Sequence, residues 1–194
     1  MVIGIIIAIV VIIILAWVLI YNRLVHAQTD TDNAWSQIDV QLQRRNDLIP
    51  NLVNTVKGYA NYESNTLQKV IKYRGQMVHI DPNSSKSGVT RQQMMNISNQ
   101  LTGALKSLFA VSERYPDLKA NENFKQLMAE LTNTENKIAY ARQLYNQVIA
   151  RYNAMIRTFP NNLVAGSKFT KRDYLKAPES AKAVPNVHFG DFKN

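Results

Sequence analysis

The chain has 194 residues, of which 46% are hydrophobic and 19% are charged, and its formal net charge is +9. It contains no cysteine, so a disulfide framework, a thiolate zinc site and a cysteine nucleophile are excluded. Its basic residues are scattered, without a finger or helix-turn-helix signature, so we predict no nucleic-acid partner. They indicate a solvated surface of mixed charge, or attraction to anionic lipid headgroups beside a membrane.

An uncharged aliphatic run, from Val2 to Ile20, is the first element of the chain. At about 1.5 Å per helical residue it extends for roughly 28 Å, close to the thickness of the hydrocarbon core of a bilayer. Trp17 and Tyr21 suit the membrane interface, and Arg23 can extend into the headgroups. We therefore predict a transmembrane anchor over residues 1–22, with membrane lipids as the partners of residues 2–20.

Two other structures compete with an anchor for this run. A cleavable secretory signal is favoured by the small-residue sequence Val25-His26-Ala27. Such a signal, however, has a basic segment before an apolar stretch of only about 7–15 residues, and no Lys or Arg precedes this run. A buried core helix would need apolar partners on every face, more than the rest of the chain supplies. The membrane anchor therefore remains the prediction.

The anchor is expected to continue outward as a helical stalk over residues 23–79. Apolar residues recur there at three- and four-residue steps, which is typical of one face of a helix: Trp35, Ile38, Leu42, Ile49, Leu52, Val56 and Tyr59. Arg45 falls on the same face, where a charge is expensive to bury unless it is paired. Pro50 removes the backbone bond to the carbonyl of Asn46, and because the apolar phase is kept we predict a kink and not a break.

Two further helices are predicted beyond a loop at Asp81–Gly88, which is rich in Ser and contains Pro and Gly. The first covers residues 90–115 and ends before Pro116, which cannot continue it. The second covers residues 121–159 and begins at Asn121. It keeps the spacing of a coiled coil over about five heptads.

Residues 161–194 are predicted to form a short helix near Lys168–Lys176 and then an extended tail. Because no strand pattern competes with the helices, the fold class is all-α. We expect an N-terminal transmembrane helix that continues into an elongated antiparallel bundle of three long helices, plus one short C-terminal helix. The bundle occupies residues 23–160; its first helix leaves the membrane, the second returns and the third leaves again.

Residues that perform catalysis or bind metals do not form recognisable patterns. The histidines His26, His79 and His188 lie far apart, and none has a metal-ligand partner at helical spacing. Glu130 and Glu135 are five residues apart, which places them on different faces of a helix. The chain has no phosphate-binding glycine loop and no nucleophile elbow. We therefore predict no metal site, no cofactor and no enzymatic activity.

The densest group of distinctive residues lies in segment 33–59. Its candidate partner-binding or register-fixing residues are Trp35, Asp39, Arg44, Arg45, Asp47, Pro50, Lys57 and Tyr59. Arg44 or Arg45 can pair with a carboxylate and fix the register of the bundle, which an inward position favours. The same groups can instead contact lipid phosphates or a partner protein. A less favoured alternative is a catalytic site built from Asp39, Arg44, Arg45 and Asp47.

A long motif in this segment runs from Asp39 to Val53 and reads Asp-Val-Gln-Leu-Gln-Arg-Arg-Asn-Asp-Leu-Ile-Pro-Asn-Leu-Val. Together with Val56-Lys-Gly-Tyr-Ala60, it closely resembles the hallmark of the LemA family of bacterial membrane proteins. Further motifs of the family are similar to three other segments: Tyr21-Asn-Arg-Leu-Val25, Arg157-Thr-Phe-Pro-Asn-Asn162 and Pro185-Asn-Val-His-Phe189. The resemblance covers nearly the whole chain, although Asn46 stands where an aromatic residue is common. It implies an anchored helical bundle, and it implies no activity, because the family has no settled biochemical function.

The anchor, the heptads and the lack of catalytic groups favour a single-pass protein whose helical rod is a scaffold or adaptor at the bacterial inner membrane. It would act through homo-oligomers and an unidentified protein partner. The alternative is an anionic-lipid-binding or membrane-remodelling module, because the charge is basic. Positive charges follow the span and none precedes it, which favours an outside N-terminus and a cytoplasmic bundle.

Overall fold

The computed structural model describes residues 1–58, 64–79 and 91–176, and in these ranges all regular secondary structure is helical. The all-α fold class is therefore confirmed. Three predicted features lie outside the described residues: Tyr59, the loop at Asp81–Gly88, and the tail beyond residue 176.

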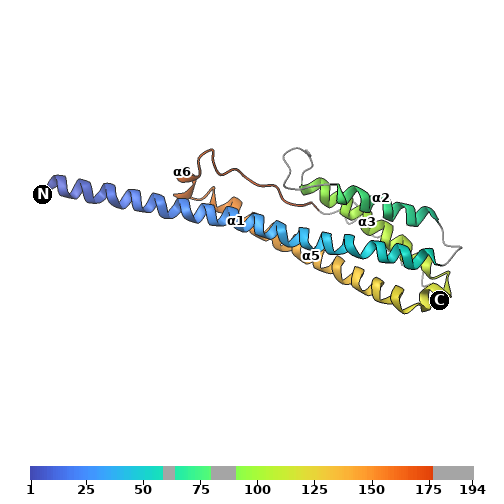
Figure 1. Cartoon of the computed structure of the whole chain (residues 1–194). Coiled ribbons are helices and arrows are strands. Elements are labelled where there is room, and N and C mark those ends of the chain that lie inside the picture. Colours follow the sequence, from blue (N-terminus) through green and yellow to red (C-terminus); the bar gives the residue numbers. More distant parts are fainter. Residues whose placement is uncertain (59–63, 80–90, 177–194) are drawn as a thin grey trace, which may run out of the picture.

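Helix α1 (Val2–Lys57) joins the apolar run and the stalk in one continuous helix (Figure 1). Pro50 lies inside this helix and does not end it, so a break there is excluded. The side chains from Val2 to Leu19 are exposed, and the run is long and apolar enough to cross a membrane. Exposed apolar side chains with all backbone bonds satisfied within the helix suit a lipid environment. The membrane anchor and the bundle thus share one helix.

The later helices fold back and forth along the outer part of α1 (Figure 1). Helix α2 (Ser64–Val78) runs back toward the membrane end, α3 (Arg91–Ser112) runs outward, and α5 (Glu122–Met155) returns toward the anchor. Helix α1 packs mainly against α5, and α2 packs mainly against α3. The α1/α5 pair is therefore the longest contact in the bundle.

The single helix predicted over residues 23–79 is wrong. Helix α1 ends at Lys57, Gly58 follows it, and α2 is a separate helix. Glycine lacks a Cβ and has a low helix propensity, so the chain can leave a helix there at little cost. The apolar spacing stays in phase across this point and gives no sign of the reversal. Because of this extra reversal, the last long helix returns to the membrane and does not leave it.

The remaining long helices lie close to their predicted ranges, 90–115 and 121–159. Helix α5 begins next to Asn121, whose side chain accepts a hydrogen bond from the backbone N–H of Phe124 at 3.0 Å. This bond satisfies one of the free N–H groups at the start of the helix. Pro116 is the first residue of the short helix α4 (Pro116–Ala120). Proline is tolerated at the first position of a helix, because the N–H that it lacks would have no partner within the helix there.

The short helix predicted at Lys168–Lys176 is wrong. A short helix, α6, forms earlier, at Asn161–Ala165, and Gly166 follows it with a φ of +48°, which favours glycine. Residues 167–176 then run back along the bundle without regular secondary structure (Figure 1). We call them the return segment.

Two asparagines of α5 hold the return segment and explain why it is not helical. Asn153 donates to the carbonyl of Arg172 at 2.8 Å and accepts from its N–H at 2.9 Å. Asn146 does the same with Leu175, at 3.0 and 2.9 Å. Each amide satisfies both backbone groups of one residue, so the segment needs no helical bonds of its own.

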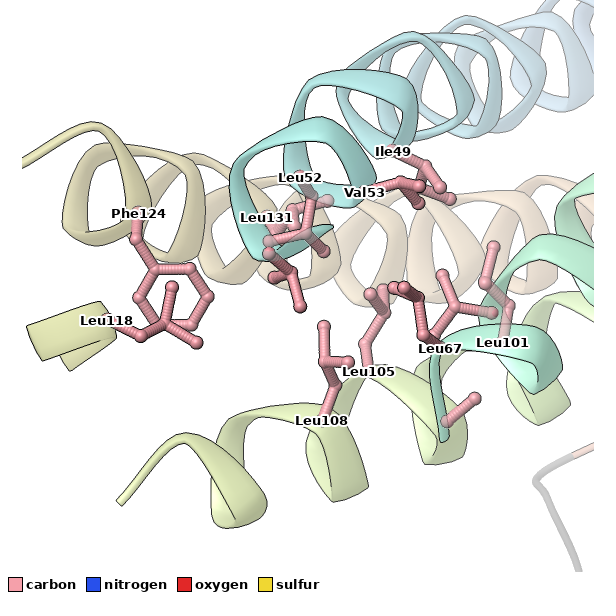
Figure 2. Packing of buried hydrophobic residues seen from close by; sticks show 13 residues of the cluster. Ile49, Leu52, Val53, Leu67, Leu101, Leu105, Leu108, Leu118, Phe124 and Leu131 are labelled. Atoms are coloured by element: carbon pink, nitrogen blue, oxygen red, sulfur yellow. The ribbon is translucent and has the colours of Figure 1, made fainter. Parts of the chain in front are cut away.

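The described residues form three apolar clusters along the bundle. The distal cluster, shown in Figure 2, includes Ile49, Leu52, Leu101, Leu108, Phe124 and Leu131. The middle cluster includes Trp35, Ile38, Leu42, Met95, Ile138, Tyr145 and Leu175. The membrane-end cluster consists of Leu24, Tyr152, Ile156, Ala165 and Phe169. The distal cluster combines residues of α1, α2, α3, α4 and α5. The middle cluster combines α1, α2, α3, α5 and the return segment, and the membrane-end cluster combines α1, α5, α6 and the return segment.

Candidate functional site

The α1/α5 pair has two different sides. On one side lie α2, α3 and the return segment, and we call this the covered side. On the other lies a groove that α1 and α5 alone line among the described residues, and we call this the open side. The candidate residues of the sequence analysis are distributed over both.

Arg45 projects from α1 into the covered side, where its side chain is 0% exposed. Its Nη1 donates to Glu135 Oε2 at 2.9 Å and to Thr102 Oγ1 at 3.0 Å, and its Nη2 donates to Ser98 Oγ at 2.5 Å. Thr102 also donates to Glu135, at 2.9 Å. One guanidinium therefore links α1, α3 and α5, between the distal and middle apolar clusters.

This polar node can fix the position of the helices around one permanent positive charge. Burial lowers the pKa of Arg45, because desolvation disfavours its charge, and the carboxylate of Glu135 opposes that effect. An arginine nevertheless stays protonated in proteins. Sliding any of the three helices along its axis would leave this buried charge without its partners, which is strongly unfavourable. The node therefore favours a single axial register.

Pro50 provides a second polar contact on the covered side. As the sequence predicted, it leaves the carbonyl of Asn46 without its helical donor. The Nε of Arg74 in α2 donates to this oxygen at 3.2 Å. The proline therefore creates an acceptor on α1 to which α2 attaches.

Trp35 is buried in the middle cluster, with its ring edge-to-face against Tyr145 at 5.9 Å. The guanidinium of Arg91 lies over the Trp35 ring at 5.2 Å and donates to Asp32 at 2.8 Å. Arg172 of the return segment donates to the same carboxylate. Asp32 thus connects α3 and the return segment to α1.

The charges around Asp32 shift two pKa values. Partial burial would raise the pKa of Asp32, but its hydrogen bonds and charge interactions with Arg172 and Arg91 outweigh burial and lower it. Burial would lower the pKa of Arg91, and its bonds to Asp32 and Tyr145 outweigh that effect and raise it. Both shifts favour the ionised pair at neutral pH.

The other candidate residues do not contribute to the polar contacts around Arg45 and Asp32. Asp39, Arg44 and Asp47 line a groove on the outer surface of α1, whereas Arg45 points into the core. The four residues of the catalytic alternative therefore do not converge. Lys57 is the exposed last residue of α1.

The open side is rich in amides. Hollows of about 370–460 Å³ lie along its groove. Amide side chains from both helices line them: Asn33, Gln37, Gln41, Asn51 and Asn54 of α1, and Asn123, Gln126 and Asn136 of α5. Arg44 and Glu130 join the two helices by an exposed ion pair at 2.8 Å.

Apolar side chains and an unsatisfied acceptor accompany these amides. Tyr140 is 69% exposed and Leu144 is 38% exposed, and both line the groove. The Oε1 of Gln41 is buried and has no hydrogen-bond partner among the described residues. A mixture of exposed aromatic and aliphatic groups with exposed amides is typical of a surface that binds another polypeptide.

Sequence reasoning missed several residues of the covered side. Glu135 follows Thr134, the polar residue on the apolar stripe of α5, and Ser98 and Thr102 are four residues apart beside the stripe of α3. This alignment of polar positions was a usable sign of a polar layer opposite Arg45. Nothing in the pattern pointed to Arg172. Among the residues that the structure describes, no group of three or more His, Asp or Glu side chains is placed to hold a metal ion.

Comparison with known proteins finds one family and several relatives. The LemA family matches residues 34–189. The chain is 31% identical to Protein LemA of Metamycoplasma hominis over 144 residues, which are 74% of this chain and 63% of that protein. It is 26% identical to Magnetosome protein MamQ 2 of Paramagnetospirillum magneticum over 175 residues, 80% of this chain and 64% of that protein. Magnetosome protein MamQ of Magnetospirillum gryphiswaldense is 24% identical over 163 residues, 75% of this chain and 60% of that protein. The chain thus spans less than two thirds of the length of each relative.

Proposed function

The chain belongs to the LemA family, and on that premise we propose that it is a single-pass membrane protein whose helical rod is a scaffold for protein assembly. Self-association through the open side is the first step. The observation that carries this proposal is the amide-lined groove of the α1/α5 pair, which has exposed Tyr140 and Leu144 beside its amides. The apolar run of α1 anchors the rod in a membrane.

A second copy of the chain is the partner that fits this groove. Copies anchored in one bilayer through α1 have the same orientation, so a twofold axis along the rod places residues of equal height opposite each other. An amide both donates and accepts hydrogen bonds, and so it can bond to the same amide of another copy. Like charges in that position would repel. Gln37, Gln41 and Asn51 of α1, which line the groove, are all amides.

Packing of two α1/α5 pairs would produce a four-helix arrangement in the middle of the dimer. The three- and four-residue spacing of α5 suits coiled-coil-like packing of this kind. An unidentified second protein would bind the assembled rod, and no enzymatic activity is part of the proposal. The separation of Arg45 from Asp39, Arg44 and Asp47 favours a structural use of these residues.

We assign the rod to the cytoplasmic side of the bacterial inner membrane. Arg23 follows the span, and the fold brings Lys168 back to the same level, where its ammonium lies over the ring of Tyr21 at 4.8 Å. Positive charge close to a span marks its cytoplasmic end. A reporter that is active only in the periplasm should therefore be silent when fused after Asn194. Periplasmic activity of that fusion would contradict the orientation.

Sedimentation of the full-length chain in mild detergent tests the assembly. We expect a discrete oligomer, and we expect Gln37→Glu with Gln41→Glu to weaken its association roughly tenfold or more, equivalent to about 1.4 kcal/mol, because carboxylates would then face their own copies. Gln100→Glu is the matched control, since this exposed amide belongs to α3 and not to the groove. A strictly monomeric wild type would contradict self-association. Equal oligomers in all variants would exclude the open side as the interface.

A further inference from the structure

Two large apolar side chains are exposed at the membrane end of the bundle. Phe159, in the turn before α6, is 74% exposed, and Leu163 of α6 is 62% exposed. The opposite side of α6 is packed: Ala165 is buried in the membrane-end cluster, and Val164 lies against it. A hydrogen bond also holds the turn between α5 and α6: Asn161 Nδ2 donates to the backbone carbonyl of Met155, the last residue of α5, at 3.2 Å. The two exposed side chains therefore belong to an ordered element.

This element lies at the level where the apolar run of α1 ends. Figure 1 shows α6 beside this part of α1. Phe169, just beyond α6, packs edge-to-face on Tyr21 at 5.7 Å, and Tyr21 directly follows Ile20. Leu24, which shares a cluster with Ala165, is only about 6 Å along the helix from Ile20. A bilayer that surrounds the run up to Ile20 therefore has its headgroup layer at the height of α6.

The charged groups around α6 have the sign that a headgroup layer attracts. Lys168 lies over the Tyr21 ring and donates to its hydroxyl, and Arg23 and Arg157 are exposed nearby in the chain. Basic side chains beside apolar ones are typical of segments that lie in a membrane interface. Each basic residue near an anionic surface strengthens the binding to that surface.

We propose that α6 is a second membrane contact of this protein. Phe159 and Leu163 enter the interfacial layer of the bilayer that α1 spans, and Arg23, Arg157 and Lys168 meet its lipid phosphates. A single span fixes the position of the rod but leaves its tilt and rotation free. The contact through α6 restricts both, and it would determine in which direction the open side faces. The inference rests on the membrane anchoring in the proposed function, and it does not depend on self-association.

The absence of cysteine from the sequence gives a direct test. Leu163→Cys and Gln100→Cys each accept one nitroxide label in the full-length chain, reconstituted in vesicles of phosphatidylcholine and phosphatidylglycerol. Gln100 is the matched control, because it is exposed on α3 outside the groove. It is flanked by Ser98 and Thr102, which contact Arg45, about 38 Å along α1 beyond Ile20. We expect the label at 163 to collide with oxygen more than with a water-soluble nickel chelate, and the label at 100 to show the reverse. Equal preference for the nickel chelate at both positions would overturn the proposal.

Two further measurements separate the lipid from other occupants. If another copy covers α6, the spectrum of the label at 163 will show spin–spin broadening that disappears on dilution with unlabelled chains, and this would overturn the proposal. In vesicles of phosphatidylcholine alone we expect the oxygen preference at 163 to decrease, because the phosphate contacts lose their anionic partners. An unchanged preference would overturn the assignment of Arg23, Arg157 and Lys168. Failure of these tests would leave the oligomer measured by sedimentation unaffected, so the two proposals can be distinguished.

Discussion

Two ion pairs join α1 to α5, and they lie on opposite sides of the helix pair. Arg45 and Glu135 meet at 2.9 Å on the covered side, and Arg44 and Glu130 meet at 2.8 Å on the open side. The side chain of Arg45 is 0% exposed, whereas that of Arg44 is 48% exposed. The two N–O distances are similar, but they say little about how much each pair contributes to the free energy of unfolding. That contribution depends on whether the remaining partner is buried or exposed after the other one is lost. The polar contacts of the covered side therefore specify the fold, whereas on the open side α1 and α5 alone line the groove among the described residues.

The largest effect is expected from Glu135→Leu on the covered side. It leaves the buried guanidinium of Arg45 without its carboxylate. Breaking a fully buried pair costs about 3–5 kcal/mol of the free energy of unfolding, and because the side chain of Glu135 is 38% exposed we expect a loss near the lower end of this range. Denaturant unfolding in detergent, followed by circular dichroism, measures this loss. The double variant R45M/E135L should recover most of it, because apolar groups of similar size replace the whole pair. Wild-type stability of Glu135→Leu would contradict the role of the node.

A smaller loss is expected where the covered side extends to the return segment. Asn153→Ala removes both hydrogen bonds to the backbone of Arg172, at a cost of about 1–2 kcal/mol. Hydrogen exchange of residues 170–176 should become faster. Asn136→Ala, an amide of the open side, is the control and should leave this exchange unchanged. Slow exchange in both variants would show that other contacts hold the segment.

The contact between Arg74 and the carbonyl freed by Pro50 predicts a coupling. Arg74→Met should lower the free energy of unfolding by about 1 kcal/mol, because the carbonyl of Asn46 loses its donor. In a Pro50→Ala background the new N–H of residue 50 bonds this carbonyl, and the effect of Arg74→Met should decrease. A double-mutant cycle measures the difference. Equal effects in both backgrounds would show that Arg74 does not act through Asn46.

The smallest effect is expected from Arg44→Met on the open side. The pair with Glu130 is about half exposed at both ends, and such pairs contribute about 0–1 kcal/mol. Stability should change little, and the change should diminish further at high salt. The same unfolding measurement as for Glu135→Leu checks it. A loss as large as that of Glu135→Leu would remove the distinction between the two sides.

The sequence was sufficient for those parts of the fold that depend on local periodicity. The apolar run, the inward face with Arg45, and the start of α5 at Asn121 follow from spacing and capping, and the structure contains all three. The reversal after Lys57 was not predictable in this way, because the apolar face stays in phase beyond Gly58. The direction of α2 is instead decided by its packing against α3, which is a non-local contact.

Only part of the candidate site could be predicted from the sequence, because its other residues are brought together by non-local contacts. Arg45 was identified because a charge interrupts an apolar stripe, but its partners are 53 to 90 residues away in sequence. The return segment was mistaken for a helix because Asn146 and Asn153, not its own residues, determine its conformation. The open side is defined by the absence of a covering element in the part of the chain that the structure describes, and no pattern within one helix contains that information.

Cross-linking of the membrane-anchored chain through the open side tests the central claim most directly. A single cysteine at Gln37 faces its own copy if two rods associate through the groove, and disulfides form only when the Cα atoms are within about 7 Å. On mild oxidation in membranes, Gln37→Cys should form a covalent dimer, and Gln100→Cys, on the exposed surface of α3, should not. A dimer that forms equally well through both positions, or through Gln100→Cys alone, would contradict the claim that copies meet on the open side of the α1/α5 pair.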